Sequence, residues 1–289
     1  MNLKRKKVSR NKKRPAPKCR AEDQETLLEC VHAAGDILLR YFGRIIRPRQ
    51  KENTSSVVCD ADLASEKQVI RILRSRFPND GIIAEESGFQ PGPTGRTWII
   101  DPLDGTSNFV AGLPWFGVQM ALLEGTAVKA AAMLLPIDQV LYHAVPGGGA
   151  FRNGKPVRTQ APKRLSETLC AFGFDADARP TQRRRAVELL MSVAEQVRNT
   201  RATNSLVDFC YTLEGKFGGC INLCTKIWDI APAMLILPEA GVSFSALDGA
   251  PIQLDLTPKG FGRNYAIATA ASHLHRPLIE LTARHRSDR

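Results

Sequence analysis

Hydrophobic residues recur at helical spacing in two segments near the start of the chain. Apolar positions three and four residues apart predict amphipathic helices over residues 23–42 and 62–77. A Pro-Asn-Asp-Gly turn signal follows the second helix, and a short buried strand is predicted over residues 81–84. The next apolar run begins at Trp98 and stops abruptly at Asp101. Buried strands that end in acidic residues are the first indication of a site.

The central part of the chain has the pattern of an antiparallel meander. Three strand-like runs, separated by turn residues, cover residues 116–123, 128–134 and 139–145. Asn153 and Gly154 then form a two-residue signal that is typical of a β-hairpin.

Strands and helices also occur in blocks in the second half of the chain. The predicted elements are a strand over residues 169–174, helices over 180–197 and 205–214, a strand over 217–223, a helix from Asp229 to Gly241 and a basic helix at the C-terminus. Blocks of this kind, rather than strict alternation, predict an α+β protein in which large sheets are layered with helix pairs.

The net charge of +11 belongs to one segment of the sequence. Residues 1–20 hold ten Lys and Arg and no acidic residue, which leaves 30 basic against 29 acidic residues in the rest of the chain. We expect this basic tail to be disordered, because it has too few apolar side chains to offset the entropy of ordering. Its charge could serve contact with a polyanion. The folded body is predicted to span residues 21–289, as two tightly packed halves of about 21–160 and 161–289.

Apolar runs and cysteine spacing argue against two other classes of protein. No apolar run approaches the ~18 residues that a membrane span needs, and no apolar segment of a secretory signal follows the N-terminal charges. The seven cysteines include no CxxC pair, which favours structural thiols in a reducing compartment over a zinc site. We therefore predict a cytoplasmic protein that does not contact membranes.

Asp101 and Asp104 are the most unusual residues of the pattern. Two carboxylates three positions apart at the end of a buried strand need a compensating cation, and hard oxygen ligands favour Mg²⁺. Gly105 and Thr106 add backbone N–H groups and a hydroxyl beside them, where a phosphate would bind. Taken alone, these four residues are equally compatible with a strand that ends in an Asp-Gly turn.

Further acidic residues occur at comparable structural points. Glu85 and Glu86 follow the predicted strand at 81–84, and Asp229 stands at the start of a predicted helix, where an N-cap role is also open. Together with the two aspartates above, they describe a multi-carboxylate magnesium site with a phosphate cradle. Such a site performs phosphoryl transfer or phosphate-ester hydrolysis.

The order and spacing of these segments resemble the inositol monophosphatase family. The resemblance covers roughly residues 23–275 and rests on EESG from Glu85, WIIDPLDGTSNF from Trp98, WDIA from Trp228 and EAG from Glu239. The DPxDGTxNF block is specific for this superfamily of magnesium-dependent, typically lithium-inhibited phosphatases. The resemblance implies a layered α-β-α-β-α sandwich of the inositol monophosphatase and fructose-1,6-bisphosphatase type, usually as a homodimer.

The resemblance also implies a cofactor of two or three Mg²⁺ ions. Glu85, Asp101 and the backbone carbonyl of Leu103 resemble the ligands of the first metal. Asp101, Asp104 and Asp229 resemble those of the second.

Catalytic and substrate contacts follow from the same resemblance. Gly105 and Thr106 match phosphate-contacting residues, and Thr106 with Asp62 resembles the pair that orients and deprotonates the attacking water. Glu85 belongs to the catalytic set, and Lys51 aligns with a basic residue near the metal loop. The implied reaction is direct in-line attack by water, without a covalent enzyme intermediate.

Five positions depart from the family pattern. Ser56 replaces a common Asp, and Asn222 replaces a Glu that contacts substrate hydroxyls in inositol-type enzymes. Lys226 adds positive charge near the substrate and suggests that the substrate has a second anionic group. Val242 replaces a Gly, and Pro238 falls late in a predicted helix, where it should remove a hydrogen bond or produce a kink.

The predicted function is Mg²⁺-dependent hydrolysis of a small phosphorylated metabolite, with inositol-1-phosphate as the family default. Histidinol phosphate, fructose-1,6-bisphosphate and 3′-phosphoadenosine 5′-phosphate are alternative substrates. A non-catalytic binding protein for an anionic partner is the alternative from another class. It is disfavoured because clustered carboxylates are costly to keep without a cation.

Overall fold

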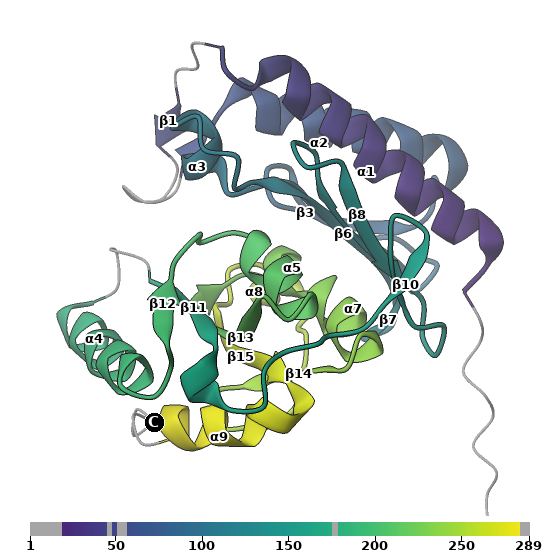
Figure 1. Ribbon diagram of the computed structural model, residues 1–289. Helices are drawn as coiled ribbons and strands as arrows, with labels where there is room; N and C mark the ends of the chain where they lie inside the picture. The colour runs from purple at the N-terminus through teal and green to yellow at the C-terminus, as the bar shows by residue number, and fades with distance from the viewer. Residues whose placement is uncertain (1–18, 45–47, 51–56, 175–178, 284–289) are drawn as a thin grey trace, which may run out of the picture.

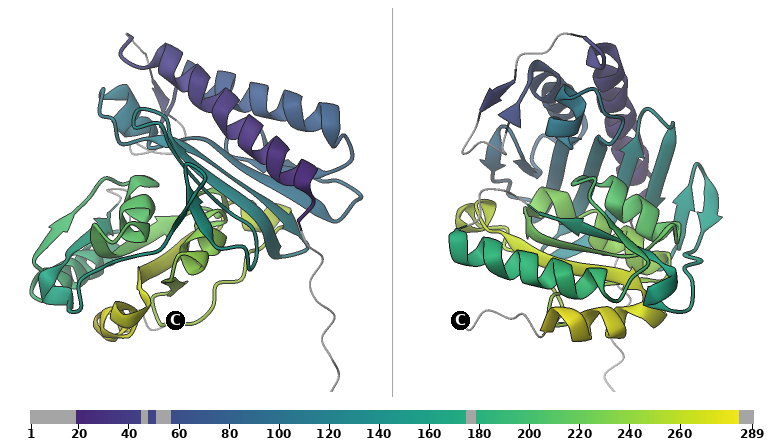
Figure 2. Two further views of the ribbon diagram at one scale, coloured as in Figure 1. Left: turned by 45° about the vertical axis from the view of Figure 1, so that its right-hand side comes forward. Right: turned by 60° about the vertical axis from the view of Figure 1, so that its left-hand side comes forward.

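Two large β-sheets are stacked between layers of helices in the computed structural model, which describes residues 19–44, 48–50, 57–174 and 179–283 (Figures 1 and 2). The first sheet has eight strands in the order β10-β9-β8-β7-β6-β5-β3-β4. Its strands are β3 Gly81–Ala84, β4 Gly88–Gln90, β5 Arg96–Asp104, β6 Gly117–Glu124, β7 Ala127–Leu135, β8 Val140–Ala144, β9 Ala150–Arg152 and β10 Lys155–Val157.

The second sheet has five strands in the order β12-β11-β13-β15-β14. Its strands are β11 Leu169–Gly173, β12 Asn199–Arg201, β13 Phe217–Thr225, β14 Val242–Ala246 and β15 Tyr265–Ala271. A separate two-stranded ribbon consists of β1 Arg49–Gln50 and β2 Val57–Val58.

Helices cover both sheets and fill the space between them. The long helices α1 Ala21–Tyr41 and α2 Asp60–Arg76 pack on the outer face of the first sheet. The inner layer consists of α5 Val207–Leu213, α6 Ile227–Ile230 and α7 Ala233–Glu239, and the outer layer on the second sheet consists of α4 Pro180–Ala194 and α9 Ser272–Ala283. The short elements α3 Thr106–Val110, η1 Leu165–Glu167 and α8 Pro258–Phe261 lie in connections.

Three hydrophobic clusters correspond to the three interfaces of this sandwich. One joins α1 and α2 to the first sheet, a second lies between the sheets around the inner helices, and a third joins the second sheet to α4 and α9. The predicted α-β-α-β-α sandwich is therefore confirmed.

Strand β5 shows why the sequence is apolar without alternation in this region. Trp98 and Ile100 pack in the cluster beneath α1 and α2, whereas Ile99 packs in the cluster between the sheets. A strand that is buried on both faces needs apolar side chains at successive positions. The strand is covered on both sides up to Asp101, which is itself only 1% exposed.

Most of the predicted elements occur where the pattern placed them. Strands β6, β7 and β8 form the predicted antiparallel meander, and Asn153 and Gly154 form the β9–β10 hairpin turn with φ of 48° and 74°. The prediction of one helix from Asp229 to Gly241 is wrong. Two short helices, α6 and α7, replace it, and Asp229 is the third residue of α6 rather than its N-cap. The helix α3 was not predicted, because five residues are too few for a periodic signal.

The tail and the ends of the chain are only partly described. Residues 1–18, Lys51 and Ser56 lie outside the described residues. Arg20, directly before α1, forms a 2.7 Å ion pair with Asp23. Helices in the described part of the chain are too short or too polar to cross a membrane. All seven cysteines are free thiols.

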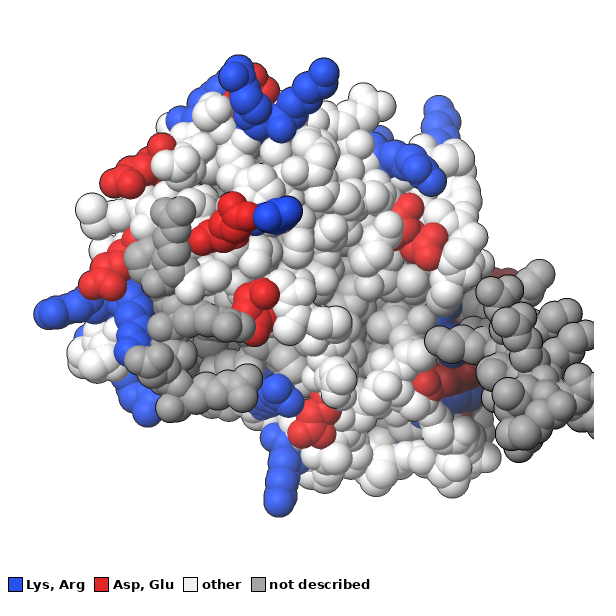
Figure 3. All heavy atoms as spheres, turned by 90° about the horizontal axis from the view of Figure 1, so that it is seen from below, with Lys and Arg blue, Asp and Glu red and all other residues white. Residues whose placement is uncertain are grey.

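Acidic and basic side chains are interspersed on the face of the molecule that Figure 3 shows. The described residues of that face therefore form no large surface of a single charge, as the near-neutral composition of the body predicts.

Candidate metal and phosphate site

Parallel pairing of β3 and β5 brings the first two acidic segments together. Ile83 pairs with Ile99 and Ala84 with Ile100, so Glu85 directly follows β3 and Asp101 directly follows the last β5 residue that pairs with β3. The Glu85 backbone N–H donates to the carbonyl of Ile100 at 3.2 Å, which extends this register by one residue. The predicted strands therefore deliver their acidic ends to the same edge of the sheet.

Asp101, Asp104 and Asp229 form a carboxylate cluster at this edge. One oxygen from each residue lies within 4.8 Å of the others. Asp101 and Asp104 come from the end of β5, and Asp229 comes from α6, which packs against β5. Glu85 is not a member of this cluster, but its charge acts on all three carboxylates.

Burial and mutual repulsion disfavour ionisation of the carboxylate cluster. Burial, followed by the charges of Glu85 and Asp104, raises the pKa of Asp101 well above its usual range. Burial raises the pKa of Asp104 to about 7, against hydrogen bonds that lower it. The pKa of Asp229 is raised by burial and by the charge of Asp104. Such carboxylates need a cation to remain ionised at neutral pH, and their oxygen donors fit a hard divalent ion.

Neutral amide groups orient these carboxylates. Gln119 Nε2 donates to Asp104 Oδ2 at 2.6 Å and reaches Asp101 Oδ2 at 3.5 Å, while the backbone N–H of Leu206 donates to Asp104 Oδ1 at 2.8 Å. The N–H of Lys226 donates to Asp229 Oδ2 at 2.6 Å. The carboxylate charge is therefore fixed in position without being neutralised by these partners.

Asp62 and Thr106 form a second polar group next to the cluster. Thr106 Oγ1 lies 3.0 Å from Asp62 Oδ1 and 3.0 Å from the carbonyl oxygen of Leu103. Asp62 is fully buried at the start of α2, and its Oδ2 accepts from the Cys59 backbone N–H at 2.9 Å and from the Cys59 thiol at 2.7 Å. Burial raises the pKa of Asp62 to about 6, against these hydrogen bonds. Two residues that are 44 positions apart in sequence are thus in direct contact.

Gly105 occupies a position that only glycine fits. Its φ of 87° lies in the left-handed region, and a Cβ there would lie 2.6 Å from the carbonyl oxygen of Trp115. The chain can therefore turn sharply between Asp104 and Thr106 and present the backbone of this segment next to the carboxylates.

Two of the atypical positions, Asn222 and Lys226, lie near the carboxyl ends of strands β11 and β13. Asn222 pairs with Gly173, and a Cβ at Gly173 would lie 2.5 Å from Asn222 Nδ2. Lys226 directly precedes α6, and its ammonium group donates to the carbonyl oxygen of Gly262 at 3.0 Å. Except for Lys51, the structure thus describes every predicted site residue, and the acidic ones gather at one edge of the first sheet.

Several residues that position the site were not predicted from the sequence. Gln119 is a polar residue within the apolar run of β6 and is fully buried, so the sequence did contain a signal for it. Glu66 accepts from the backbone N–H groups of Glu86 and Ser87 at 2.8 and 2.7 Å and so fixes the turn after β3. Cys59 stands three residues before Asp62, the spacing of a capping box.

Glu239, from the EAG motif, has a role in the fold rather than at the cluster. Its carboxylate accepts from the backbone N–H groups of Gly147 and Gly149 at 2.7 and 2.8 Å. It thereby attaches the end of α7 to the loop between β8 and β9.

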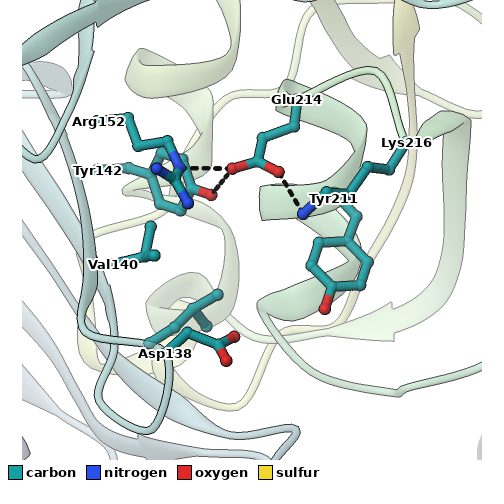
Figure 4. Close-up of a pocket in the computed structure, with 8 residues that line it drawn as sticks. Asp138, Val140, Tyr142, Arg152, Tyr211, Glu214 and Lys216 are labelled. Atoms are coloured by element: carbon teal, nitrogen blue, oxygen red, sulfur yellow. Dashed lines mark hydrogen bonds and ion pairs between the residues drawn. The ribbon is translucent and has the colours of Figure 1, made fainter.

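A cavity of about 330 Å³ lies elsewhere, between the first sheet and α5 (Figure 4). In its lining, Glu214 accepts from the Tyr142 hydroxyl at 2.5 Å, from Arg152 Nε at 2.7 Å and from Lys216 Nζ at 2.5 Å. Burial alone would raise the pKa of Glu214, but these hydrogen bonds hold that pKa below its usual value. The donors are all engaged with one carboxylate, so the group joins β8 and β9 to the end of α5.

A layered sandwich with a carboxylate cluster at the carboxyl ends of two parallel strands defines a class of metal-binding α+β proteins. The sequence model of the inositol monophosphatase family matches residues 20–287 of this chain. The chain therefore belongs to the inositol monophosphatase family.

Known proteins agree with this assignment. The chain is 32% identical to Nus factor SuhB of Xylella fastidiosa over 223 residues. The aligned region covers 74% of this chain and 78% of that protein. It is 30% identical to the fructose-1,6-bisphosphatase/inositol-1-monophosphatase of Aquifex aeolicus, over 72% of this chain and 80% of that protein. The crystal structure of extragenic suppressor protein suhB from Bartonella henselae superposes with a TM-score of 0.82 at 26% identity, over 91% of this chain and 98% of that one.

Proposed function

We propose that the protein is a magnesium-dependent phosphoric monoester hydrolase that uses water as the nucleophile. The observation that carries this proposal is the cluster of Asp101, Asp104 and Asp229, whose oxygens lie within 4.8 Å of one another. Three mutually repelling carboxylates at a buried strand end are stabilised by divalent cations and by little else.

The chain offers ligands for two or three Mg²⁺ ions. Asp101, Asp104 and Asp229 would hold the metal at the cluster, with Glu85 and the carbonyl oxygen of Leu103 completing the set. When bound, magnesium neutralises phosphate oxygens, activates water and stabilises the leaving alkoxide. Gln119 keeps Asp104 and Asp101 in place through its amide group.

Gly105 and Thr106 are proposed to contact the phosphate. The left-handed conformation of Gly105 turns the backbone immediately after Asp104, so the N–H groups of this segment lie beside the carboxylate cluster. A side chain at residue 105 would displace this turn, because its Cβ would lie 2.6 Å from the Trp115 carbonyl oxygen.

The Thr106 hydroxyl and Asp62 are proposed to orient and deprotonate the attacking water. The hydroxyl has one hydrogen and two acceptors at 3.0 Å, Asp62 Oδ1 and the Leu103 carbonyl. Donation to Asp62 leaves the Leu103 carbonyl available to a cation and the Thr106 lone pairs available to water. A pKa of about 6 keeps most of Asp62 ionised above neutral pH, so it can accept the proton.

The substrate is proposed to be a small phosphorylated metabolite, with inositol-1-phosphate as the default for this family. Histidinol phosphate, fructose-1,6-bisphosphate and 3′-phosphoadenosine 5′-phosphate are the alternatives. We further propose that the enzyme is a cytoplasmic homodimer and that the basic tail of residues 1–20 contacts polyanions. We also propose that Lys51 is the substrate-binding basic residue near the metal loop that the resemblance implies.

Phosphate release from a panel of these esters tests the proposal. Release should require Mg²⁺, and Asp104→Asn should abolish it while the circular dichroism spectrum stays unchanged. Asp138→Asn is a matched control, because Asp138 is an exposed residue at the Glu214 cavity. Turnover by Asp104→Asn would contradict the assignment of the metal ligands. No release from any ester by the wild-type protein would favour the alternative, a non-catalytic binding protein for an anionic partner.

A further inference from the structure

Gln119 is a polar side chain in the interior of the layered fold. It lies on β6, where it pairs with Asp101 of β5 and with Met133 of β7, and it is fully buried. Paired residues present their side chains to the same face of a sheet, and Met133 packs in the hydrophobic cluster between the two sheets. The Gln119 amide therefore has an apolar side chain on one side and a carboxylate on the other.

Only one end of this amide has a hydrogen-bond partner in the described part of the chain. Nε2 donates to Asp104 Oδ2 at 2.6 Å and reaches Asp101 Oδ2 at 3.5 Å. The carbonyl oxygen, Oε1, is buried as well, but none of the described residues donates to it. A buried acceptor that is left without a donor costs about 1–3 kcal/mol. The carbonyl group of Gln119 thus points to a donor that arrives with a ligand.

The chemistry of the carboxylate cluster limits what this donor can be. Oε1 and Nε2 are bonded to the same carbon, so Oε1 also lies beside Asp104. Ionised carboxylates and phosphate oxygens only accept hydrogen bonds, and a metal ion carries no hydrogen. Mg²⁺ loses its hydration shell reluctantly and keeps several waters when it binds to carboxylates. A water on the bound ion is therefore the donor that fits Oε1.

An amide suits this position better than a charged group of similar size. Its donor and its acceptor lie side by side, like a carboxylate oxygen and a water on neighbouring positions of one octahedral ion. A carboxylate at residue 119 would repel Asp104, and an ammonium group would compete with the metal ion. Because Gln119 pairs with Asp101, the same sheet register positions a metal ligand and the amide that holds it.

We propose that Gln119 is a positioning residue with two roles at the metal site: its Nε2 holds Asp104 and Asp101, and its Oε1 accepts a hydrogen bond from a water of the bound magnesium ion. This inference rests on the proposed magnesium site and assigns the hydration of the ion to a particular side chain. Gln119 then contributes to metal affinity without being a metal ligand itself.

Magnesium affinity tests the contribution of Gln119. Gln119→Met keeps an unbranched side chain of similar length but removes the amide donor and acceptor. Titration calorimetry on the metal-free protein should give a Mg²⁺ dissociation constant that is roughly 10–100-fold higher than in the wild type, as expected when a group that orients metal ligands is lost. Thr269→Val is the matched control, because Thr269 Oγ1 is also buried without a partner among the described residues but lies on β15 of the second sheet. This control should keep the wild-type dissociation constant.

The result that would overturn the inference is an equal dissociation constant in Gln119→Met and the wild type. Urea unfolding in EDTA shows whether the variant is folded. A crystal structure of the wild-type protein with bound Mg²⁺ tests the water directly and does not depend on the variant. A water on the ion should lie within about 3.2 Å of Gln119 Oε1. Direct ligation of the ion by Oε1, or an Oε1 that still has no donor, would overturn the proposal.

These measurements separate failure of this inference from failure of the phosphatase function. Neither calorimetry nor the metal-bound structure requires turnover of a substrate. A protein that binds Mg²⁺ with this water but hydrolyses no ester would contradict the phosphatase function alone. A protein that hydrolyses esters but lacks this water would overturn only the role of Gln119.

Discussion

The pH dependence of stability in the absence of metal is the sharpest consequence of the carboxylate cluster. The pKa of Asp104 is about 7 in the folded protein, against an ordinary value of 3.8. Between pH 3.8 and about pH 7, Asp104 is therefore protonated in the folded state but ionised in the unfolded chain. Stability conferred at low pH must then be lost as pH rises through this window.

The magnitude follows from the same two values. One pKa unit corresponds to 1.36 kcal/mol, so full ionisation of Asp104 costs the metal-free fold at most about 4 kcal/mol by pH 8. Partial exposure of Asp104 reduces this upper limit. Asp101 and Asp229 shift in the same direction and steepen the loss. Bound Mg²⁺ should remove the penalty, because it replaces the protons.

Urea unfolding with and without Mg²⁺ checks this expectation. In EDTA the free energy of unfolding should fall by a few kcal/mol between pH 5 and pH 8, and in saturating Mg²⁺ it should stay nearly level. The gap between the two curves should therefore widen with pH. The side chain at residue 104 cannot ionise in the Asp104→Asn variant. The free energy of unfolding of this variant should therefore depend less on pH in EDTA and should increase little when Mg²⁺ is added. Parallel curves in EDTA and Mg²⁺ would refute the reasoning.

Substitutions at three further positions test individual contacts. Gly105→Ala should destabilise the fold by about 1–3 kcal/mol and sharply lower turnover, because the Cβ at a φ of 87° meets the Trp115 carbonyl; a urea midpoint equal to that of the wild type would contradict this. Cys59→Ala should lower kcat by roughly fivefold through loss of the ~1 kcal/mol thiol hydrogen bond to Asp62, whereas Cys59→Ser should keep it; equal kinetics of both variants would remove the role of the thiol. Glu214→Ala should lower the free energy of unfolding by about 1–3 kcal/mol and Glu214→Gln by less, because alanine leaves Tyr142 without its acceptor; unfolding and Mg²⁺-dependent kcat are measured together, and a loss of kcat with unchanged stability would contradict this structural role.

The Cys59 thiol keeps its proton at the start of α2. Its thiol is fully buried, and burial with the charge of Asp62 raises its pKa to about 12. The thiol therefore stays protonated and remains a hydrogen-bond donor to Asp62.

Local sequence signals determined the elements and the chemistry of the site. The apolar run of β5 followed by Asp101, Asp104 and Gly105 predicted a buried strand that ends in a charged turn, and the structure has both. The meander of β6 to β8 and the hairpin at Asn153 were also readable, because strand periodicity and turn residues act over short distances. The resemblance to one family rested on the same short segments.

Contacts between distant segments were decided only by the tertiary structure. Asp229 joins Asp101 and Asp104 because α6 packs against β5, and Thr106 meets Asp62 across 44 residues. Lys226 likewise reaches the Gly262 carbonyl oxygen across 36 residues of sequence.

The boundary at Asp229 shows the physical reason most clearly. The sequence predicted one helix with an N-cap aspartate, whereas the structure has two short helices and an aspartate in the first turn of α6. Its carboxylate accepts from the Lys226 N–H and also faces the carboxylates of β5. Periodicity and turn signals describe neighbours along the chain. Sheet register and layer packing decide which charges meet, and a metal site depends on that meeting.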